Sequence, residues 1–408
     1  MKGASQQSAE QGRTSESSSL RKSGEHVPSY DGEASQSSSG KSPHCYDVED
    51  LITLKVFLQV HKGTVFYSKT LWIETCSTGL LYWVTFGVLF YFRWENFSDF
   101  VGKEANIRAF IAMFSTLIGL LLSFYTALNL GRWWQMRMLL QDVQEGCKSL
   151  CLQLAHGVTS DAEVLGSVRR YCRASLFLVF AYNHDRDDTP LDAAVRENFL
   201  EPDEAEALRQ INPTSTFAQA EVLWSWLANI VTRLHLMQMT KGKDPQYCAL
   251  LKAVDKGRSG VAGIQTFLET PIPMGYIHLL CWMVKLHNII LTLLMALSSV
   301  KHAGGREGFD EVSVFRTAFR AFFMPFLYNA ILILNAEVTD PFGNDVQDFD
   351  QKYFGEQMDK CAGSLIDAAH ILPPWLSQHI KEKKSFAAVG ESSSSAFRAV
   401  KSLPPNQP

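Results

Sequence analysis

The sequence predicts an all-α membrane protein with four transmembrane helices and a large helical cytosolic part. Four apolar segments have about the 20 residues that a bilayer-spanning helix needs. The long stretch between the second and third segments carries apolar residues at helical spacing, and the alternation typical of strands is essentially missing. Hydrophobic residues form 46% of the 408 residues, too few for a chain that lies mostly in lipid. We therefore expect a membrane part and a cytosolic part.

The two ends of the chain are expected to be disordered. Residues 1–48 are mostly small or polar and cannot bury enough apolar surface to fold. No apolar segment follows Met1, which argues against a secretory signal, and acids such as Glu10 and Glu16 argue against a cleaved transit peptide. Residues 351–408 are expected to form a helix followed by a disordered tail, which leaves 49–350 as the main domain.

The first two predicted spans have clear apolar character. Residues 70–92 are nearly free of charge, with Glu74 as the one acid near the entry end. Residues 109–130 carry no charge and end at Arg132-Trp133-Trp134, a basic and aromatic pattern typical of a membrane interface. Both segments are therefore predicted to cross the bilayer.

The other two predicted spans contain ionisable or helix-bending residues. Residues 272–300 include Lys285, and residues 314–334 begin with arginines and contain Pro325. An even number of spans places both termini on one side, and lysines before the first span favour the cytosol. In the long loop, the apolar pattern predicts three helices, over residues 143–154, 162–182 and 221–239.

The composition argues against several function classes. The net charge of −4 gives no electrostatic basis for nucleic-acid binding. Eight cysteines lack the spacing of a zinc site and are expected to be reduced. Motifs of phosphate loops, dinucleotide sites, zinc proteases and serine hydrolases are missing, so we do not expect an enzyme. A membrane-anchored scaffold or enzyme that uses the cytosolic helices is the alternative.

An acidic segment, residues 335–350, follows the fourth predicted span. It places carboxylates on both sides of the turn Pro341-Phe342-Gly343. Carboxylate and carbonyl oxygens are the ligands that calcium takes, and the turn brings acids before and after it together. The sequence predicts a calcium site here. A solvated loop at an acidic helix end is the other interpretation.

Four motifs in order resemble those of the bestrophin family of anion channels across residues 49–350. They are Lys62-Gly63-Thr64, Ser123-Phe124-Tyr125, Ile272-Pro273-Met274-Gly275-Tyr276 and Asp340-Pro341-Phe342-Gly343-Asn344-Asp345. The resemblance implies a homopentamer in the lipid bilayer with one axial pore, permeable to chloride and to other small inorganic anions including bicarbonate. It leaves open the plasma membrane or an organellar membrane such as that of a plastid. A coupled anion carrier is the alternative to a passive channel.

The resemblance implies that the second span lines the pore neck with Thr116, Leu120 and Phe124. These positions are spaced i, i+4 and i+8, so they project from one helix face. In a pentamer each position becomes a ring, and apolar rings gate by expelling water from the constriction. The alternative is a stripe that contacts lipid or another helix, as apolar stripes in membrane helices commonly do.

The resemblance also implies two sites outside the neck. It places a cytosolic aperture at Gly242, where glycine supplies no side chain and the exit is expected to be wide; a surface turn is the alternative. It places calcium coordination on Asp345 and Asp348, with Asp340 and Glu337 at positions where animal members hold uncharged amides.

Two basic residues lie within the third predicted span. His278 and Lys285 are seven residues apart and can share a helix face, which indicates an electropositive patch on the anion path. Alternatively, Lys285 is paired inside the helix bundle with an acid such as Glu74 or with a backbone carbonyl.

Overall fold

The computed structural model describes a chain whose regular structure, over the described residues, is entirely helical. The described residues are 64–92, 104–183, 189–211, 215–240, 243–303, 310–343, 348–369, 371 and 373–379. They belong to one compact unit, residues 42–408. The predicted all-α class is confirmed, because the described residues contain no strand. The predicted disordered tails lie largely outside the described residues.

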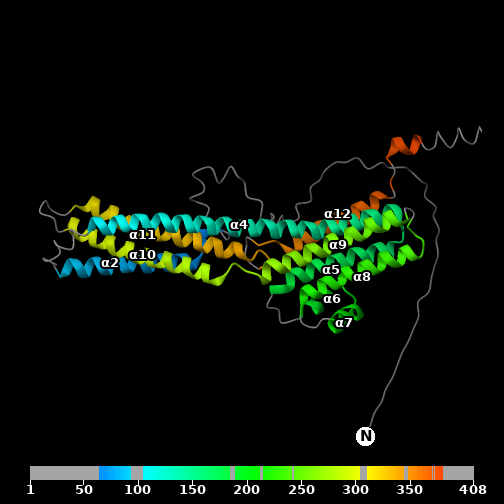
Figure 1. Cartoon of the computed structure of the whole chain (residues 1–408), viewed down its shortest axis with the longest axis horizontal. Coiled ribbons are helices and arrows are strands. Elements are labelled where there is room, and N and C mark those ends of the chain that lie inside the picture. The colour runs from blue at the N-terminus through cyan, green and yellow to red at the C-terminus, as the bar shows by residue number, and fades with distance from the viewer. Residues whose placement is uncertain are drawn as a thin grey trace, which may run out of the picture. The chain divides into compact units, whose positions relative to one another are not determined.

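One bundle contains the helices long and apolar enough to cross a membrane. It consists of α2 (Lys69–Tyr91), the first part of α4 (Glu104–Gly157), α10 (Met274–Ala303) and α11 (Glu311–Thr339). Helices α10 and α11 each pack against both α2 and α4 (Figure 1). The Ser68 and Asp310 side chains accept backbone hydrogen bonds at the starts of α2 and α11, which fixes where these two helices begin. These helices correspond to the four predicted spans.

Helix α4 corrects the prediction that the second span and the segment 143–154 are separate helices. It runs without a break from Glu104 to Gly157. No proline interrupts it, and Gly131 lies where an added Cβ would meet no neighbour, so the glycine is not required by packing. The aromatic pattern after Leu130 therefore does not end the helix. The same helix continues into the second bundle.

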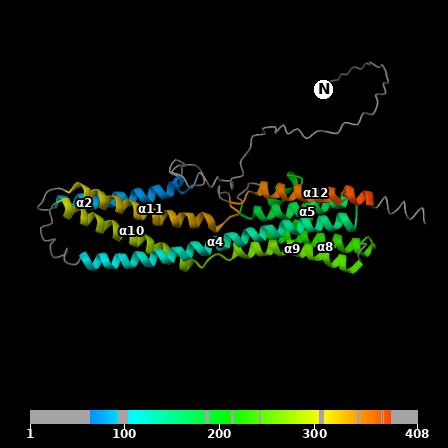
Figure 2. The same cartoon turned by 90° about the horizontal axis from the view of Figure 1, so that it is seen from above.

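The second bundle surrounds the other part of α4 (Figure 2). It contains α5 (Ala162–Phe180), α8 (Thr216–Leu236), α9 (Lys243–Glu269) and α12 (Gln351–Ala369), with the short α6 (Pro190–Arg196) and α7 (Pro202–Ile211) alongside. The described elements also include the single-turn helices η2 (Val65–Tyr67) and η4 (Ala181–Asn183) and a short helical segment at 374–379. Helices α5 and α8 match the predicted 162–182 and 221–239. Helices α6, α7 and α9 were not predicted.

Glycines let α4 and α9 approach within backbone contact. A Cβ added to Gly146 would lie 2.8 Å from the Gly257 Cα, and one added to Gly260 would lie 2.7 Å from the Leu139 carbonyl oxygen. A Cβ on Gly257 would overlap the buried ring of Trp224 on α8. We call Gly146, Gly257 and Gly260 the glycine seam. It fixes the distance between the long helix and α9, its main neighbour in the second bundle.

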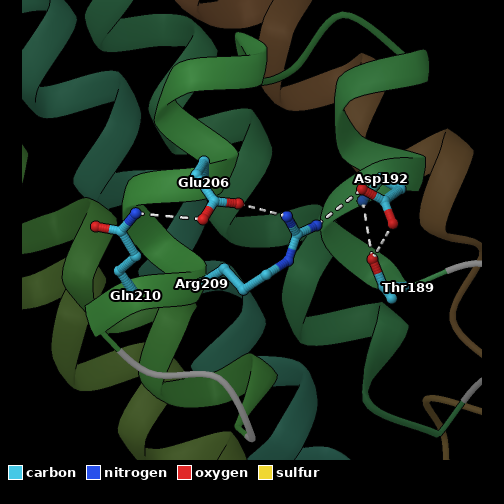
Figure 3. Close-up of polar contacts among 5 residues, drawn as sticks. All are labelled: Thr189, Asp192, Glu206, Arg209 and Gln210. Carbon is cyan, nitrogen blue, oxygen red and sulfur yellow. Dashed lines mark hydrogen bonds and ion pairs between the residues drawn. The ribbon is translucent and has the colours of Figure 1, made fainter.

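The outer edge of the second bundle is held by exposed polar contacts (Figure 3). Arg209 on α7 donates to Glu206, at 2.7 Å, and to Asp192 on α6, at 2.9 Å. Thr189 caps α6 and also donates to Asp192. Ion pairs that are exposed to solvent in this way add little to stability. Arg209 is therefore a suitable position for control substitutions.

Candidate functional site

The three predicted neck residues all project away from their own helix bundle. Thr116 is exposed, and the side chains of Leu120 and Phe124 are 54% and 57% exposed. The opposite side of α4 is buried, at Ile118, Leu122 and Tyr125. The single chain thus leaves an apolar stripe uncovered on the membrane-spanning part of α4. Such a stripe can line a pore between subunits or contact lipid.

Hydrogen bonds hold the buried side of α4 against α10 and α11. The Ser115 hydroxyl lies 2.6 Å from Nε2 of His287, which is 1% exposed. Further toward the second bundle, Asn335 donates to the Thr126 hydroxyl at 2.8 Å and accepts from Asn129 at 3.0 Å. Polar contacts of this kind orient a membrane helix, because few competing partners exist in lipid. They set the rotation of α4, and therefore the direction in which the stripe faces.

Arg132 serves a role that the sequence did not reveal. Its guanidinium donates to the carbonyls of Phe267, at 2.6 Å, and Thr270, at 3.1 Å, at the end of α9. These carbonyls lack helical partners, and a cation at a helix C-terminus is favourable. The basic residue expected at the membrane interface therefore also joins α4 to α9 where the two bundles meet.

An aromatic cluster links the acidic segment to α4. The ring of Phe349 lies 5.2 Å from Trp133 and 5.4 Å from Phe342, measured between ring centroids. Phe342 is 1% exposed and contacts Phe180 at the end of α5, at 5.0 Å. The chain is thus held against the long helix just beyond the stripe. The sequence signals for this cluster were the Pro341-Phe342-Gly343 turn and the tryptophan pair after Leu130.

The acidic residues of the segment have different surroundings. Asp340 ends α11 and accepts a hydrogen bond from the Phe342 amide at 3.2 Å, and Phe349 donates to the Pro341 carbonyl at 2.8 Å. Asp348 is 6% exposed, and its carboxylate lies where a Cβ on Gly343 would be 2.8 Å away. The turn therefore closes on itself and brings Asp348 beside Gly343, while the meeting of acids from both sides of the turn stays a prediction.

The described residues do not by themselves form a metal site. Glu337 lies half-buried in the last turn of α11, and Asp345 lies outside the described residues. Within the described ranges, no group of three or more histidine, cysteine, aspartate or glutamate side chains could hold a metal ion. Asp348 with the carbonyls of the turn supplies oxygen ligands suited to a hard cation, but not a full set. The four predicted ligands are therefore not brought together among the residues described.

The predicted cytosolic aperture at Gly242 lies outside the described residues. On one side, Thr240 is buried, and its hydroxyl lies 2.9 Å from Nδ1 of His235. On the other side, α9 begins at Lys243.

Lys285 lies in a polar cluster between three membrane helices. Its Nζ is 2.8 Å from the Glu74 carboxylate on α2 and donates to Asn329 on α11 at 3.1 Å. The structure thus contains the ion pair with Glu74 that the sequence analysis gave as the alternative for Lys285. His278 is exposed on the first turns of α10. The role of His278 and Lys285 as an electropositive patch on the anion path stays a prediction.

Breaking the Glu74–Lys285 pair is expected to destabilise the membrane bundle. Lys285→Met leaves a carboxylate without its cation at membrane depth and should cost roughly 1–3 kcal/mol. The double substitution with Glu74→Gln should recover part of this loss. The melting temperature of the detergent-solubilised protein, monitored by size-exclusion chromatography after heating, measures the loss in the single variant and the recovery in the double variant. Equal melting temperatures for the single and double variants would contradict the coupling.

The sequence matches a known family model over most of its length. The model is described as bestrophin, RFP-TM, chloride channel, and it matches residues 46–366. This chain belongs to the bestrophin family. No curated protein matches the chain.

Solved structures of bacterial bestrophin homologues have the same fold. One crystal structure of the homologue from Klebsiella pneumoniae is 14% identical, covers 72% of this chain and 98% of its own, and has a TM-score of 0.59. A single-substitution variant of that homologue is 16% identical, covers 72% and 99% of the two chains, and has a TM-score of 0.58. At this identity the likeness concerns the fold alone. The family resemblance and the four-span helical fold expected from the sequence are confirmed.

Proposed function

We propose that this bestrophin family member is a subunit of a passive, pentameric channel for chloride and other small anions, including bicarbonate. Membership of a family of chloride channels supports anion conduction and argues for a channel rather than an enzyme. The four apolar helices support an integral membrane protein. The observation that carries the proposal is the apolar stripe of α4, which one subunit leaves uncovered at membrane depth.

In this proposal the stripe forms the neck of the pore when subunits assemble around an axis. Leu120 and Phe124 then form apolar rings, which oppose ion passage because an ion loses hydration and gains no replacement ligand there. The positive edge of the Phe124 ring favours an anion over a cation. Thr116 is exposed, and its hydroxyl donates to the Ala112 carbonyl at 3.0 Å, so this ring contains a polar atom. This ring is expected to be a weaker barrier than the two apolar rings.

Reconstituted protein tests the proposal directly. Purified protein in liposomes should pass chloride passively, without nucleotide and without a second ion moving in the opposite direction. Planar-bilayer recordings with chloride replaced by bicarbonate then rank the two anions. A flux that saturates and requires counter-transport would identify a carrier instead. The absence of any anion flux would favour a scaffold or an enzyme.

We also propose that the acidic segment binds calcium through Asp345 and Asp348 and controls the neck. The support is the buried position of Asp348 and the aromatic contacts that join the segment to Trp133 on α4. Calcium would neutralise the carboxylates and hold the turn closed. A change in this turn would reach α4 through Phe349.

Asp345→Asn and Asp348→Asn are expected to abolish any calcium dependence of the current while leaving the channel assembled. Asparagine keeps the shape of the side chain and removes the charge that calcium requires. Recordings with and without micromolar calcium measure the effect. Asp255→Asn on α9 is the control, because the Asp255 side chain is 67% exposed and should not affect the response. Full calcium dependence in both test variants would exclude this site.

A further inference from the structure

A cavity of about 490 Å³ lies between α5, the segment after α6 and the start of α12. Its volume falls within the range of about 300–1,000 Å³ that small-molecule sites occupy. The side chains that determine its chemistry are Arg173, Phe177, Glu197, Phe199, Lys352 and Glu356. These residues belong to the second bundle and include neither the residues of the apolar stripe nor Asp348. None of the roles proposed above involves the cavity.

Arg173 is held in the cavity wall by contacts that leave one of its guanidinium nitrogens without a hydrogen-bond acceptor. Its guanidinium carbon lies 5.2 Å from the centroid of the Phe199 ring. It also packs directly on the backbone of Gly355, where any side chain would collide with it. The Nη1 group is buried and has no hydrogen-bond partner among the residues that the structure describes. A buried donor without an acceptor is unfavourable, and more so when it is charged, unless a ligand supplies the acceptor.

The surroundings of Arg173 are polar but provide no close acceptor for Nη1. Burial is the largest influence on the pKa of Arg173 and lowers it, while the charges of Asp359, Glu356 and Glu197 act in the opposite direction. Asp359 pairs with Arg169 at 2.9 Å, so its carboxylate is already engaged. A carboxylate that enters the cavity would supply the acceptor that the described residues lack.

The other charged residues of the lining limit which kind of carboxylate ligand the cavity can bind. The lining contains two basic side chains, Arg173 and Lys352, and two acidic ones, Glu197 and Glu356. Glu356 contacts Lys360 at 3.3 Å, but this exposed pair is weak and leaves the carboxylate accessible. A phosphate or dicarboxylate would bring excess negative charge near both glutamates. A ligand with one carboxylate and one ammonium group matches the balanced charges of the lining.

We propose that this cavity binds an α-amino acid with an apolar side chain. The carboxylate lies on Arg173 with Lys352 nearby, the ammonium group faces Glu197 and Glu356, and the apolar side chain packs against Phe177 and Phe199. Each charged side chain of the cavity then has a counterpart on the ligand. The aromatic residues bind the part of the ligand that carries no charge.

Binding of tritiated L-phenylalanine to the purified full-length protein in detergent tests the proposal. We expect saturable binding. Unlabelled 3-phenylpropionate, which lacks the amine, and phenethylamine, which lacks the carboxylate, should each compete at least about tenfold more weakly than L-phenylalanine. No saturable binding, or equal competition by either analogue, would overturn the proposal. Because the assay measures no current, its result is independent of whether the protein conducts anions.

Substitutions test which residues of the cavity bind the carboxylate and the ammonium group of the ligand. Arg173→Gln should weaken L-phenylalanine binding by at least about tenfold, because it removes the charged partner of the carboxylate. Arg209→Gln, at the exposed edge of the same bundle, should bind as the unmodified protein does. If Arg173→Gln does not fold, Glu197→Gln decides, because Glu197 is exposed and should tolerate the change. That variant should reduce the difference in affinity between L-phenylalanine and 3-phenylpropionate. An unchanged difference in affinity would show that Glu197 does not bind the ammonium group.

Discussion

Replacing Leu120 or Phe124 with alanine is expected to raise the basal chloride current by about tenfold. This corresponds to a barrier lowered by about 1.4 kcal/mol. Alanine widens the proposed constriction and lets an ion keep more of its water, so the dehydration barrier falls. Because the side chains of Leu120 and Phe124 are more than half exposed within one subunit, the substitutions should leave its fold intact. Recordings in planar bilayers, normalised to the amount of protein incorporated, measure the change.

Leu80→Ala is the matched control for the neck variants. Leu80 is 66% exposed on α2, so it is an equally accessible apolar side chain on a membrane helix outside α4. Its replacement should leave the current unchanged. A similar increase in current for Leu80→Ala, or no increase for either neck variant, would show that the α4 stripe contacts lipid rather than the permeating ion.

Gly260→Ala is expected to destabilise the protein by roughly 1–3 kcal/mol, because even one methyl group overfills the glycine seam. The added Cβ would lie 2.7 Å from a backbone oxygen of α4, which cannot move without shifting the helix. Thermal melting of the solubilised protein measures this loss. The substitution should lower the melting temperature of the whole second bundle, and not only that of α9.

Gly166→Ala provides the control for the glycine seam. Gly166 lies within α5, is exposed, and has no atom within 4 Å of the position that a Cβ would take. Alanine is a better helix former than glycine by about 1 kcal/mol, so this variant should be at least as stable as the unmodified protein. Equal losses in Gly166→Ala and Gly260→Ala would mean that the seam does not determine stability.

The features that could be predicted from the sequence are those determined by residues close together along the chain. The spans follow from continuous apolar segments, and α5 and α8 from apolar spacing along one helix. Helix α9 was not predicted, because Gly257 and Gly260 resemble helix-breaking residues when no packing partner is known. In the structure they permit backbone contact with α4, so tertiary packing outweighs their low helix propensity.

Several parts of the candidate site depend on contacts between distant segments. Arg132 reaches carbonyls more than one hundred residues later in the chain, and the contact of Phe349 with Trp133 joins segments even further apart. Neither contact has a local pattern that would predict it. The spacing of Thr116, Leu120 and Phe124 predicted a common face, but only the buried residues on the opposite side show which way that face points.

The order in which the helices emerge during synthesis has a consequence for maturation. Helix α9 is made before α10 and α11, so the cytosolic half of α4 can pack against it while the last two spans still await insertion. Helix α12 emerges only after all four spans, and its Phe354 carbonyl then accepts from the buried Gln144 amide on α4 at 2.9 Å. A nascent chain that ends after α11 would hold the first bundle but lack α12 of the second, and this amide would have no acceptor. Closure of the Asp348 segment onto α4 is therefore expected to be the last step in the folding of one subunit.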